Sequence, residues 1–372
     1  MRIIILGPSY PFRGGIAAFN DRLAIALRDA GHEVKVITFS LQYPSFLFPG
    51  KTQYSEGPAP SDIHIDKSVN SINPFNWIKI GSKIKNMNAD LVISRFWLPF
   101  MGPCLGTILR FARKNRKTKV ISIIDNIIPH ESRPGDKVFS KYFLNANDGF
   151  ITMTESVHLD LLRFDNKKSR IISPHPLYDH YGDLLDKKNS LKQLNLDSNN
   201  KYMLFFGLIR DYKGLDLLLK AMPSISPDIH LIIAGEYYSE KEVYTKQIHD
   251  LDLQDRVHQS EGFIPDEKVN LYFSACDIVV QPYKTATQSG VTQIAYHFEK
   301  PMIVTNVGGL SEMCPNNQVG FVSEPNAIDI SNKISDFYSD NIERFSDGIK
   351  SKKQEYEWPR FVKNIIGLYR DL

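Results

Sequence analysis

The stretch 277-DIVVQPYKTATQSGVTQIAYHFEKPMIVTN-306 contains two short apolar runs, DIVVQPY and PMIVTN, separated by a helical pattern. Strands of this kind, joined by a helix, are typical of a parallel sheet with helices on both faces. The stretch therefore predicts an α/β fold. Its helix opens with the small and polar residues TQSG, which bury little apolar surface and therefore suggest a role other than packing.

The same alternation recurs in two sets along the chain. The strand-like runs of the first set are Arg2–Leu6, Val34–Phe39, Leu91–Phe96, Val120–Ile124, Phe150–Met153 and Arg170–Ile172. Those of the second set are Met203–Phe206, His230–Ala234, Val257–His258, Ile278–Gln281 and Met302–Thr305. With helical patterns such as Ala17–Ala30 and Leu105–Lys114 between them, they predict two doubly wound Rossmann-like domains divided near residue 180. The last stretch, EYEWPRFVKNIIGLYRDL, predicts an amphipathic helix that could pack on either domain.

Composition is that of an ordinary globular protein. The 372 residues are enough for two cores, with 42% of them hydrophobic and 23% charged. A net charge of +3 gives no reason to expect nucleic-acid binding. Cys104, Cys276 and Cys314 have no metal-ligand or CxxC spacing, so we expect reduced core residues. The start has no signal-peptide pattern and the run from Phe96 to Phe111 is too short for a membrane span, so we expect a cytoplasmic protein or one at a membrane surface.

Three loops follow predicted strands, where ligands bind in open α/β sheets. The first, GPSYPFRGG, has Gly14 and Gly15 at a helix start, where they either admit a ligand to the backbone or merely form a turn. In the second, FFGLIRDYKGLDLLLKAM, Arg210 and Lys213 either converge on one anion or remain solvated. The third is TQSG, where Ser289 stands at a helix N-terminus that favours a phosphate, or is a plain N-cap.

At these residues the chain resembles the family-4, or group 1, retaining glycosyltransferases with the GT-B fold. The segments that carry the resemblance are GPSYPFRGGIAAF, GLIRDYKGLDLLLKAM, AGEYY and TQSGVTQIAYHFEKPMIVTNVGGLSEM. The resemblance implies two Rossmann-like domains that face a central cleft. Residues 1–180 would form the acceptor-side domain together with a C-terminal helix of about residues 356–372, and residues 181–355 would form the nucleotide-sugar-binding domain.

The resemblance also implies a site for a UDP- or GDP-sugar. The residues that would bind the donor lie in the three loops: Gly14, Gly15, Arg210, Lys213, Gln288, Ser289, Gly290 and Val291. Arg210 and Lys213 would also act in catalysis, because cations stabilise the charge of the leaving diphosphate. Relatives work without a bound metal, and the chain has no DxD-like cluster beside these loops, so we expect no metal and no cofactor other than the donor.

The chain departs from the family pattern at two places. Where many relatives carry two glutamates eight residues apart, this chain has Ala286 and Ile294, and Gln288 is our candidate replacement. Where relatives often have a catalytic-site histidine, the segment IIDNIIPHES offers Asp125 and His130. We expect these two residues to share the role, although either could be structural.

The implied function is transfer of a hexose to a saccharide acceptor, which we expect to be lipid-linked, in cell-envelope polysaccharide or lipopolysaccharide synthesis. Loss of both glutamates leaves open a non-catalytic two-lobed protein that binds sugar nucleotides. An epimerase or a phosphorylase of the same fold is a further alternative. The sequence does not specify the donor, the base, the acceptor or the linkage.

A basic cluster suggests where the protein works. Six cations lie within ten positions, directly after the apolar run FWLPFMGPCLG: Arg110, Arg113, Lys114, Arg116, Lys117 and Lys119. An apolar surface beside a basic cluster suits an anionic membrane surface. We therefore predict a peripheral membrane enzyme; the alternative is a buried strand and helix followed by a solvated turn.

Overall fold

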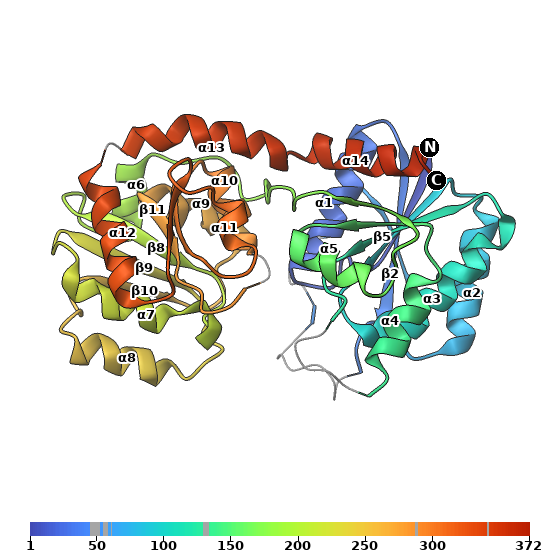
Figure 1. The fold of residues 1–372 in the computed structure, drawn as a ribbon, viewed down its shortest axis with the longest axis horizontal. Helices are drawn as coiled ribbons and strands as arrows, with labels where there is room; N and C mark the ends of the chain where they lie inside the picture. Colours follow the sequence, from blue (N-terminus) through green and yellow to red (C-terminus); the bar gives the residue numbers. More distant parts are fainter. Residues whose placement is uncertain (45–52, 55–58, 61, 129–133, 287–288, 341) are drawn as a thin grey trace. The chain divides into compact units, whose positions relative to one another are not determined.

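The computed structural model describes residues 1–44, 53–54, 59–60, 62–128, 134–286, 289–340 and 342–372. The chain forms two compact units (Figure 1). Unit 1 comprises Met1–His175 and Trp358–Leu372, and unit 2 comprises Pro176–Glu357.

Unit 1 contains a parallel sheet of seven strands in the order β3-β2-β1-β4-β5-β6-β7 among the described residues. The strands are β1 (Arg2–Leu6), β2 (Glu33–Leu41), β3 (His64–Asn70), β4 (Leu91–Phe96), β5 (Lys119–Ile124), β6 (Gly149–Thr152) and β7 (Ser169–Ile172). The central strands are rich in isoleucine and valine and are fully buried, as expected when helices cover both faces of a sheet.

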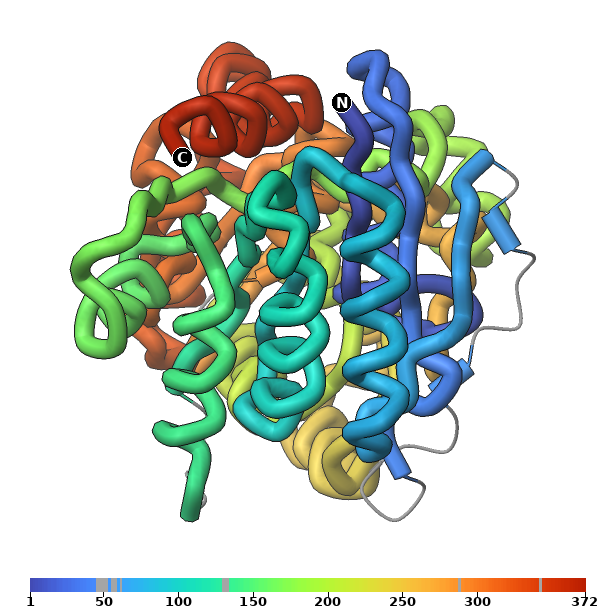
Figure 2. Tube along the Cα trace, turned by 90° about the vertical axis from the view of Figure 1, so that its right-hand side faces the viewer, coloured from blue at the N-terminus to red at the C-terminus, as the bar shows by residue number. Residues whose placement is uncertain are grey.

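Helices form a layer on each face of this sheet. One layer consists of α2 (Pro74–Asn86), α3 (Gly102–Ala112), α4 (Asp136–Leu144) and α5 (Glu155–Leu162). Figure 2 shows α2, α3 and α4 side by side, in agreement with their contacts. The other layer consists of α1 (Gly15–Asp29) and the C-terminal helix α14 (Trp358–Arg370).

Helix α14 is anchored at both of its ends in unit 1. Trp358 packs against Phe19 of α1, with ring centroids 5.2 Å apart. At the end of the chain, Lys119 Nζ donates a hydrogen bond to the carbonyl oxygen of Leu372 over 2.8 Å. The apolar side of this helix therefore completes the core of unit 1.

Unit 2 contains a second parallel sheet, with the strand order β10-β9-β8-β11-β12-β13. Its strands are β8 (Lys201–Phe206), β9 (Ile229–Gly235), β10 (Val257–Glu261), β11 (Ile278–Gln281), β12 (Met302–Thr305) and β13 (Gly320–Ser323). Its helices are α6 (Lys187–Gln193), α7 (Leu215–Ala221), α8 (Lys241–Asp250), α9 (Asp266–Ala275), α10 (Gly290–His297), α11 (Leu310–Met313), α12 (Ala327–Ser339) and α13 (Ser346–Lys353). The strand order reverses between β8 and β11, and ligands bind at such switch points in open α/β sheets.

The predicted fold of two doubly wound α/β sheets is confirmed. The three cysteines are buried free thiols, as expected for core residues. No helix within the described ranges is both long enough and apolar enough to span a bilayer.

The apolar run FWLPFMGPCLG does not form the surface that we predicted beside the basic cluster. Phe96 ends β4, and Met101, Cys104 and Leu105 lie in the turn and helix that follow; all four are at most 1% exposed. The alternative of a buried strand and helix is therefore correct for this run. Its apolar side chains are already used by the core and form no surface that could contact a membrane.

Candidate active site

The β8–α7 loop of unit 2 carries the two predicted cations. After β8, Ile209 forms a bridge to Tyr237, and its N–H donates to the carbonyl oxygen of Glu236 over 2.8 Å. Arg210 follows, and a single 3-10 turn, η4 (Asp211–Lys213), leads to Gly214 and α7. The bridge extends the sheet beyond β8, so the loop starts from a fixed backbone.

Lys213 is a buried cation. Its side chain is 8% exposed, and its ammonium makes no hydrogen bond or ion pair with any described residue. Nζ lies 5.5 Å from the ring centroid of Tyr283, and 3.3 Å from the position that a Cβ on Gly207 would occupy. Burial lowers the pKa of Lys213, and the positive charge of Arg210 lowers it further. A cation held in this way favours an anionic ligand, because burial of an unpaired charge costs free energy.

Arg210 lies on the solvent side of the same loop. Its side chain is exposed, and its guanidinium lies 4.9 Å from the ring centroid of Tyr238. Arg210 lies three residues before Lys213 in the same loop, and its positive charge contributes to the lowered pKa of Lys213. One buried ammonium and one accessible guanidinium thus stand beside the end of β8, where they can bind the same anion.

A hydrogen bond and two ion pairs connect the loop after β11 to the loop after β8. The N–H of Lys284 donates to the carbonyl oxygen of Tyr212 over 2.7 Å, and its Nζ contacts carboxylate oxygens of Asp211 and Asp216 at 2.8 and 2.9 Å. Gly214 has φ +67°, and a Cβ there would lie 1.9 Å from the carbonyl oxygen of Pro282. Only glycine permits this close approach, which brings the two loops together.

The start of α10 lies beside this cation pair. Val291 Cγ2 is 3.7 Å from the position that a Cβ on Gly207 would occupy, so Val291 and the Lys213 ammonium both lie next to that position. Ser289 precedes the helix, but its hydroxyl lies 3.2 Å from the hydroxyl of Tyr283 and caps no helical N–H. The first N–H groups of α10 therefore have no side-chain cap from Ser289. Gly290 is exposed there, and Gln288 lies outside the described residues.

A cavity of about 150 Å³ adjoins the same glycine. It lies between the ends of β8 and β9 and the start of α9, and its lining includes Tyr181, Phe206, Gly207, Glu236 and Phe263. Apolar rings with a carboxylate at one edge suit a flat heterocycle that also carries hydrogen-bond donors. Gly207 thus lies both in the lining of this aromatic cavity and next to the Lys213 ammonium.

Unit 1 holds Asp125 in an ion pair that the sequence analysis did not anticipate. Arg95 donates two hydrogen bonds to the carboxylate, from Nε over 2.6 Å and from Nη2 over 2.7 Å. The side chains of Arg95 and Asp125 are only 5% and 12% exposed, and Arg95 also lies 3.9 Å from the centroid of the Phe19 ring. Asp125 is therefore fixed in position by a bidentate pair. The second candidate here, His130, falls in a part of the chain that is not described.

The start of α1 is the other predicted ligand-binding feature of unit 1. Gly14 has φ +111° and precedes Gly15, the first residue of α1; both are exposed, and no side chain caps the helix. Nearby, the hydroxyl of Ser9 donates to Asp21, and burial raises the pKa of Asp21 to about 6. The glycines thus leave the N-terminus of α1 open to a ligand.

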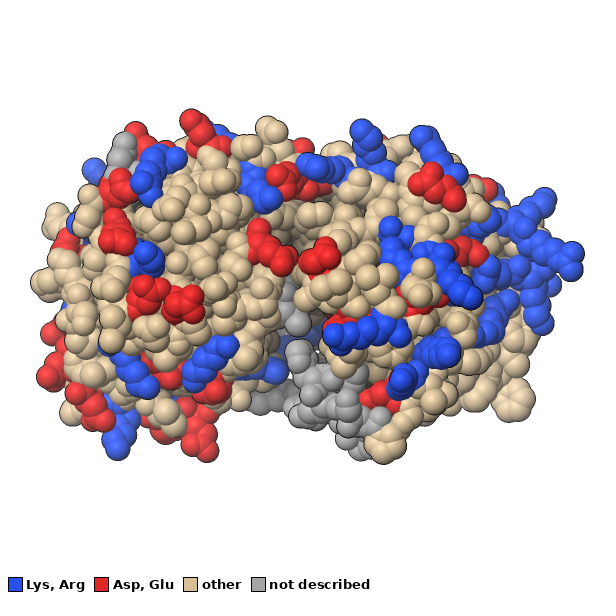
Figure 3. Space-filling view, viewed as in Figure 1, with Lys and Arg blue, Asp and Glu red and all other residues tan. Residues whose placement is uncertain are grey.

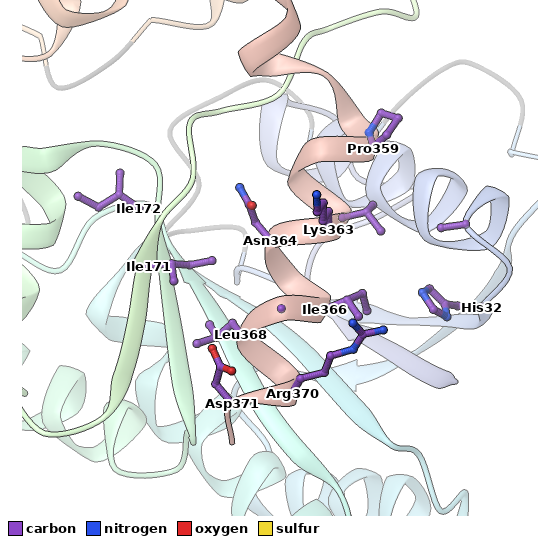
Figure 4. Close-up of a pocket in the computed structure, with 13 residues that line it drawn as sticks. His32, Ile171, Ile172, Pro359, Lys363, Asn364, Ile366, Leu368, Arg370 and Asp371 are labelled. Atoms are coloured by element: carbon purple, nitrogen blue, oxygen red, sulfur yellow. The ribbon is translucent and has the colours of Figure 1, made fainter.

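A groove of about 750 Å³ also lies in unit 1, along α14 (Figure 4). Figure 4 shows Ile171 and Ile172 of β7 on one side of α14 and His32 on the other. None of the predicted site residues lines it, so its size does not make it the candidate active site.

Comparison with known proteins decides the family. Residues 186–354 match the model of the glycosyl transferases group 1, and residues 13–174 match the model of glycosyltransferase family 4. The chain belongs to this glycosyltransferase family. The two matches fall in different units, so both halves of this glycosyltransferase contribute to the assignment.

Relatives of this glycosyltransferase match it over the whole chain or over about half of it. An uncharacterized glycosyltransferase of Methanocaldococcus jannaschii is 23% identical, over 100% of this chain and 99% of its own. The lipopolysaccharide 1,2-N-acetylglucosaminetransferase of Salmonella typhimurium is 28% identical over 48% of this chain and 50% of its own. Among solved structures, HepE of Anabaena in complex with UDP superimposes with a TM-score of 0.75 at 18% identity, with complete coverage of both chains. HepE and similar solved structures are GT-B glycosyltransferases, so the predicted fold family is confirmed.

Three features of the glycosyltransferase were missed in the sequence. Arg95 lies within the apolar strand LVISRF, and a cation at the carboxyl end of a buried strand was the available signal. Phe263 follows β10 in the segment GFIPDEK, a loop at the same end of the sheet as the predicted phosphate loops. Lys284 follows the predicted strand Ile278–Gln281, but its two carboxylate partners lie about seventy residues earlier in the sequence and could not be identified from it.

Proposed function

We propose that this protein is a retaining glycosyltransferase that moves a hexose from a UDP- or GDP-sugar to a saccharide acceptor. The observation that supports this most is the buried Lys213, whose ammonium has no anionic partner among the described residues. A donor diphosphate would supply that partner. Arg210 would bind it from the solvent side, and the open N–H groups at the start of α10 would donate to its oxygens.

The same groups would accelerate the reaction. As the bond between the anomeric carbon and the diphosphate oxygen breaks, the leaving diphosphate gains negative charge. The acceptor hydroxyl oxygen bonds to that carbon, and the hydroxyl proton passes to an oxygen of the leaving diphosphate. A cation about 4 Å from an anion is worth up to about 4 kcal/mol at an effective dielectric constant of about 20. Two cations and the helix amides would stabilise this charge, and our proposal therefore requires no metal.

The remaining parts of the donor and the acceptor follow from the surrounding residues. We assign the nucleoside base to the aromatic-lined cavity beside Gly207. Val291 and Gly207 would flank the diphosphate, and Gln288, which lies outside the described residues, stays our candidate for binding the sugar or the ribose. In unit 1, Gly14 and Gly15 would admit a phosphate to the start of α1. Asp125, held by Arg95, and His130 would act at the reacting centre.

We propose a lipid-linked saccharide as the acceptor, in the synthesis of cell-envelope polysaccharide or lipopolysaccharide. Support comes from relatives: one curated relative is a lipopolysaccharide 1,2-N-acetylglucosaminetransferase. A structural neighbour is the lipopolysaccharide outer core galactosyltransferase WaaB, with a TM-score of 0.73 at 13% identity. Such an acceptor would place the enzyme at the anionic, cytoplasmic face of a membrane.

A panel of UDP- and GDP-sugars tests the proposed function. Each donor is incubated with the purified protein, with and without an acceptor mixture extracted from membranes, and nucleotide release is measured. Release that needs acceptor supports transfer. Tight nucleotide binding with no release under any condition would indicate a binding protein, and conversion of the donor without acceptor would indicate an epimerase.

The opening of α10 gives a mutational prediction. In Gly290→Val, the new Cβ would lie 3.1 Å from Cε2 of Tyr178, and its methyl groups would crowd the helix N–H groups. We expect calorimetric titration to show at least about a tenfold loss of UDP or GDP affinity, or about 1.4 kcal/mol. Gly367→Val is the matched control, because Gly367 also lies in a helix and has nothing within 4 Å of its Cβ position. Unchanged affinity in Gly290→Val would exclude the helix opening as a phosphate site.

A further inference from the structure

The first segment of unit 2, 176-PLYDHYGDLL-185, contains two tyrosines, Tyr178 and Tyr181. All residues of this segment are described, and none of them lies in a helix or a strand. A connection that only joins two elements has no need of large aromatic side chains. Both tyrosines are nevertheless partly buried and pack against the core of unit 2. Their side chains therefore have a defined place in this unit.

Two hydrogen bonds fix the path of this segment over neighbouring helices. Nε2 of His297, at the end of α10, donates to the carbonyl oxygen of Gly182 over 2.8 Å. The N–H of Leu185 donates to Oγ of Ser274, in α9, over 2.8 Å. The segment therefore lies across α10 and α9, the helices that begin beside the candidate anion site and the aromatic-lined cavity.

The hydroxyl end of Tyr178 lies at the start of α10. A Cβ on Gly290, the first residue of this helix, would lie 3.1 Å from Cε2 of Tyr178, 3.6 Å from its hydroxyl oxygen and 3.7 Å from Cζ. These three atoms form the tip of the side chain, so the phenol group itself faces the opening of the helix. A hydroxyl in this position can donate to a phosphate oxygen beside the helix N–H groups.

The side chain of Tyr181 lines the aromatic cavity. Its ring centroid lies 4.0 Å from that of His180 and 6.3 Å from that of Tyr178, so the three rings form one cluster. Burial raises the pKa of the Tyr181 hydroxyl above its usual value, and the charge of Asp266 raises it further, so the phenol is uncharged at neutral pH. An uncharged ring in the wall of a cavity can contact the flat face of a nucleoside base.

The overall charge of unit 2 makes neutral hydrogen-bond donors important for binding an anion. This unit contains 18 Lys and Arg against 27 Asp and Glu, a net charge of −9. Figure 3 shows red acidic side chains spread over the visible face of unit 2, on the left. The field of the whole unit therefore repels a diphosphate, and groups next to the ligand have to overcome this repulsion. A tyrosine hydroxyl can contribute without the desolvation penalty of another buried cation.

We propose that Tyr178 and Tyr181 bind the donor, each through a different part of the nucleotide. Tyr178 donates a hydrogen bond to the diphosphate at the start of α10, and the ring of Tyr181 contacts the nucleoside base in the cavity beside Gly207. The segment 176–185 thus completes the donor site together with the loops after β8 and β11. This proposal rests on the proposed function, because it requires a nucleoside diphosphate in this site.

Competition binding tests the two assignments separately. The full chain is titrated with UDP and GDP, and the nucleotide that binds is then displaced with inorganic pyrophosphate, which has no base, or with its nucleoside, which has no phosphate. Tyr178→Phe removes only the hydroxyl and should weaken binding of the nucleotide and of pyrophosphate about tenfold, with the nucleoside unchanged. Tyr181→Leu removes the ring and should weaken binding of the nucleotide and of the nucleoside about tenfold, with pyrophosphate unchanged.

Tyr338 of α12 provides the matched control. It is another partly buried tyrosine that packs against the core of unit 2. Its ring centroid lies 5.7 Å from Nζ of Lys201, the first residue of β8, whereas the candidate anion site follows the last residue of that strand. Tyr338→Phe and Tyr338→Leu should therefore bind all three ligands as the wild type does.

Hydrogen exchange of the wild type gives a second test that does not depend on how the variants fold. Bound UDP or GDP should slow the exchange of amides in residues 177–185, because the ligand contacts two side chains of this segment. The segment 326–339, which contains the control tyrosine, should exchange at the same rate with and without nucleotide.

The outcomes distinguish this proposal from the proposed function. If the wild type binds UDP or GDP but Tyr178→Phe and Tyr181→Leu bind it equally well, the two tyrosines only pack against the core, and this proposal alone is refuted. Equal weakening of all three ligands in both variants would refute the separate assignment of diphosphate and base. If the wild type binds neither nucleotide, the proposed function is refuted, and this proposal with it.

Discussion

Replacing Lys213 with methionine should lower turnover at least about 100-fold, or about 2.7 kcal/mol, because the leaving diphosphate loses its buried cation. Methionine has nearly the same length and fills the same space. Turnover is measured with the donor sugar that the panel identifies. Lys192→Met, which removes an exposed lysine from α6 in the same unit, should leave turnover unchanged. Near-normal turnover in folded Lys213→Met would show that Lys213 does not serve the leaving group.

The same substitution should not weaken the fold. Burial lowers the pKa of Lys213, which means that the folded protein without ligand binds this proton less tightly than the unfolded chain does. At neutral pH the charged ammonium therefore reduces the free energy of unfolding. We expect Lys213→Met to melt at the same temperature as the wild type or above it. A lower melting temperature would indicate that Lys213 has a structural role.

The lowered pKa also predicts how donor affinity depends on pH. Only the protonated ammonium attracts the diphosphate, so affinity should fall as the pH rises through the lowered pKa of Lys213, below the ordinary value of 10.5. Over the same range, the stability of the free protein should rise with pH, because the unfolded chain there holds the proton that the folded protein has lost. Nucleotide titrations of wild type and Lys213→Met across this range measure the change in affinity, and urea unfolding of the two free proteins measures the change in stability. Equal pH profiles of the two proteins would contradict the assignment.

Removing Arg95 should have the largest effect on stability. In Arg95→Met the carboxylate of Asp125 stays buried without its counter-charge, which costs about 3–5 kcal/mol of unfolding free energy. Urea unfolding, followed through the transition of unit 1, measures this loss. Arg163→Met is the control, since its pair with Asp160 is exposed on the surface of α5 and should contribute less than about 1 kcal/mol.

A double variant separates the charge from the packing. In Arg95→Met/Asp125→Leu both buried charges are gone, so most of the lost stability should return. If the double variant is as unstable as Arg95→Met, the loss comes from the contact of Arg95 with Phe19 rather than from the ion pair.

The sequence allowed most of the strands to be predicted, because a strand buried on both faces must be apolar throughout. Two strands were missed because they lie at the edges of their sheets and lack a long apolar run. β3, with the sequence HIDKSVN, is an edge strand in which only Val69 is fully buried, and its pairing with β2 has register shifts. β13 is the other missed strand; it has four residues, GFVS, and also lies at a sheet edge. Edge strands keep their place through one ladder of hydrogen bonds, which needs no apolar run.

The candidate site could be predicted only in outline. The loops after β8 and β11 could be located because carboxyl ends of parallel strands meet at one edge of a sheet. The sequence could not show which of the two cations is buried, because the burial of Lys213 depends on Gly207 and on Tyr283, which is seventy residues away. The roles of Arg210, Ser289, Gly290 and the other site residues stay predictions. The membrane role of the basic segment stays a prediction, and the burial of Phe96, Met101 and Leu105 beside it is set by tertiary packing.

Calorimetric titration of UDP and GDP into the wild type and Lys213→Met, with melting curves of both proteins, tests the leaving-group site most directly. We predict that one nucleotide binds the wild type, that its affinity for Lys213→Met is at least about 100-fold lower, and that the variant melts no earlier. Equal affinity in the two proteins, or no binding of either nucleotide to the folded wild type, would contradict the assignment of this site to a sugar-nucleotide diphosphate.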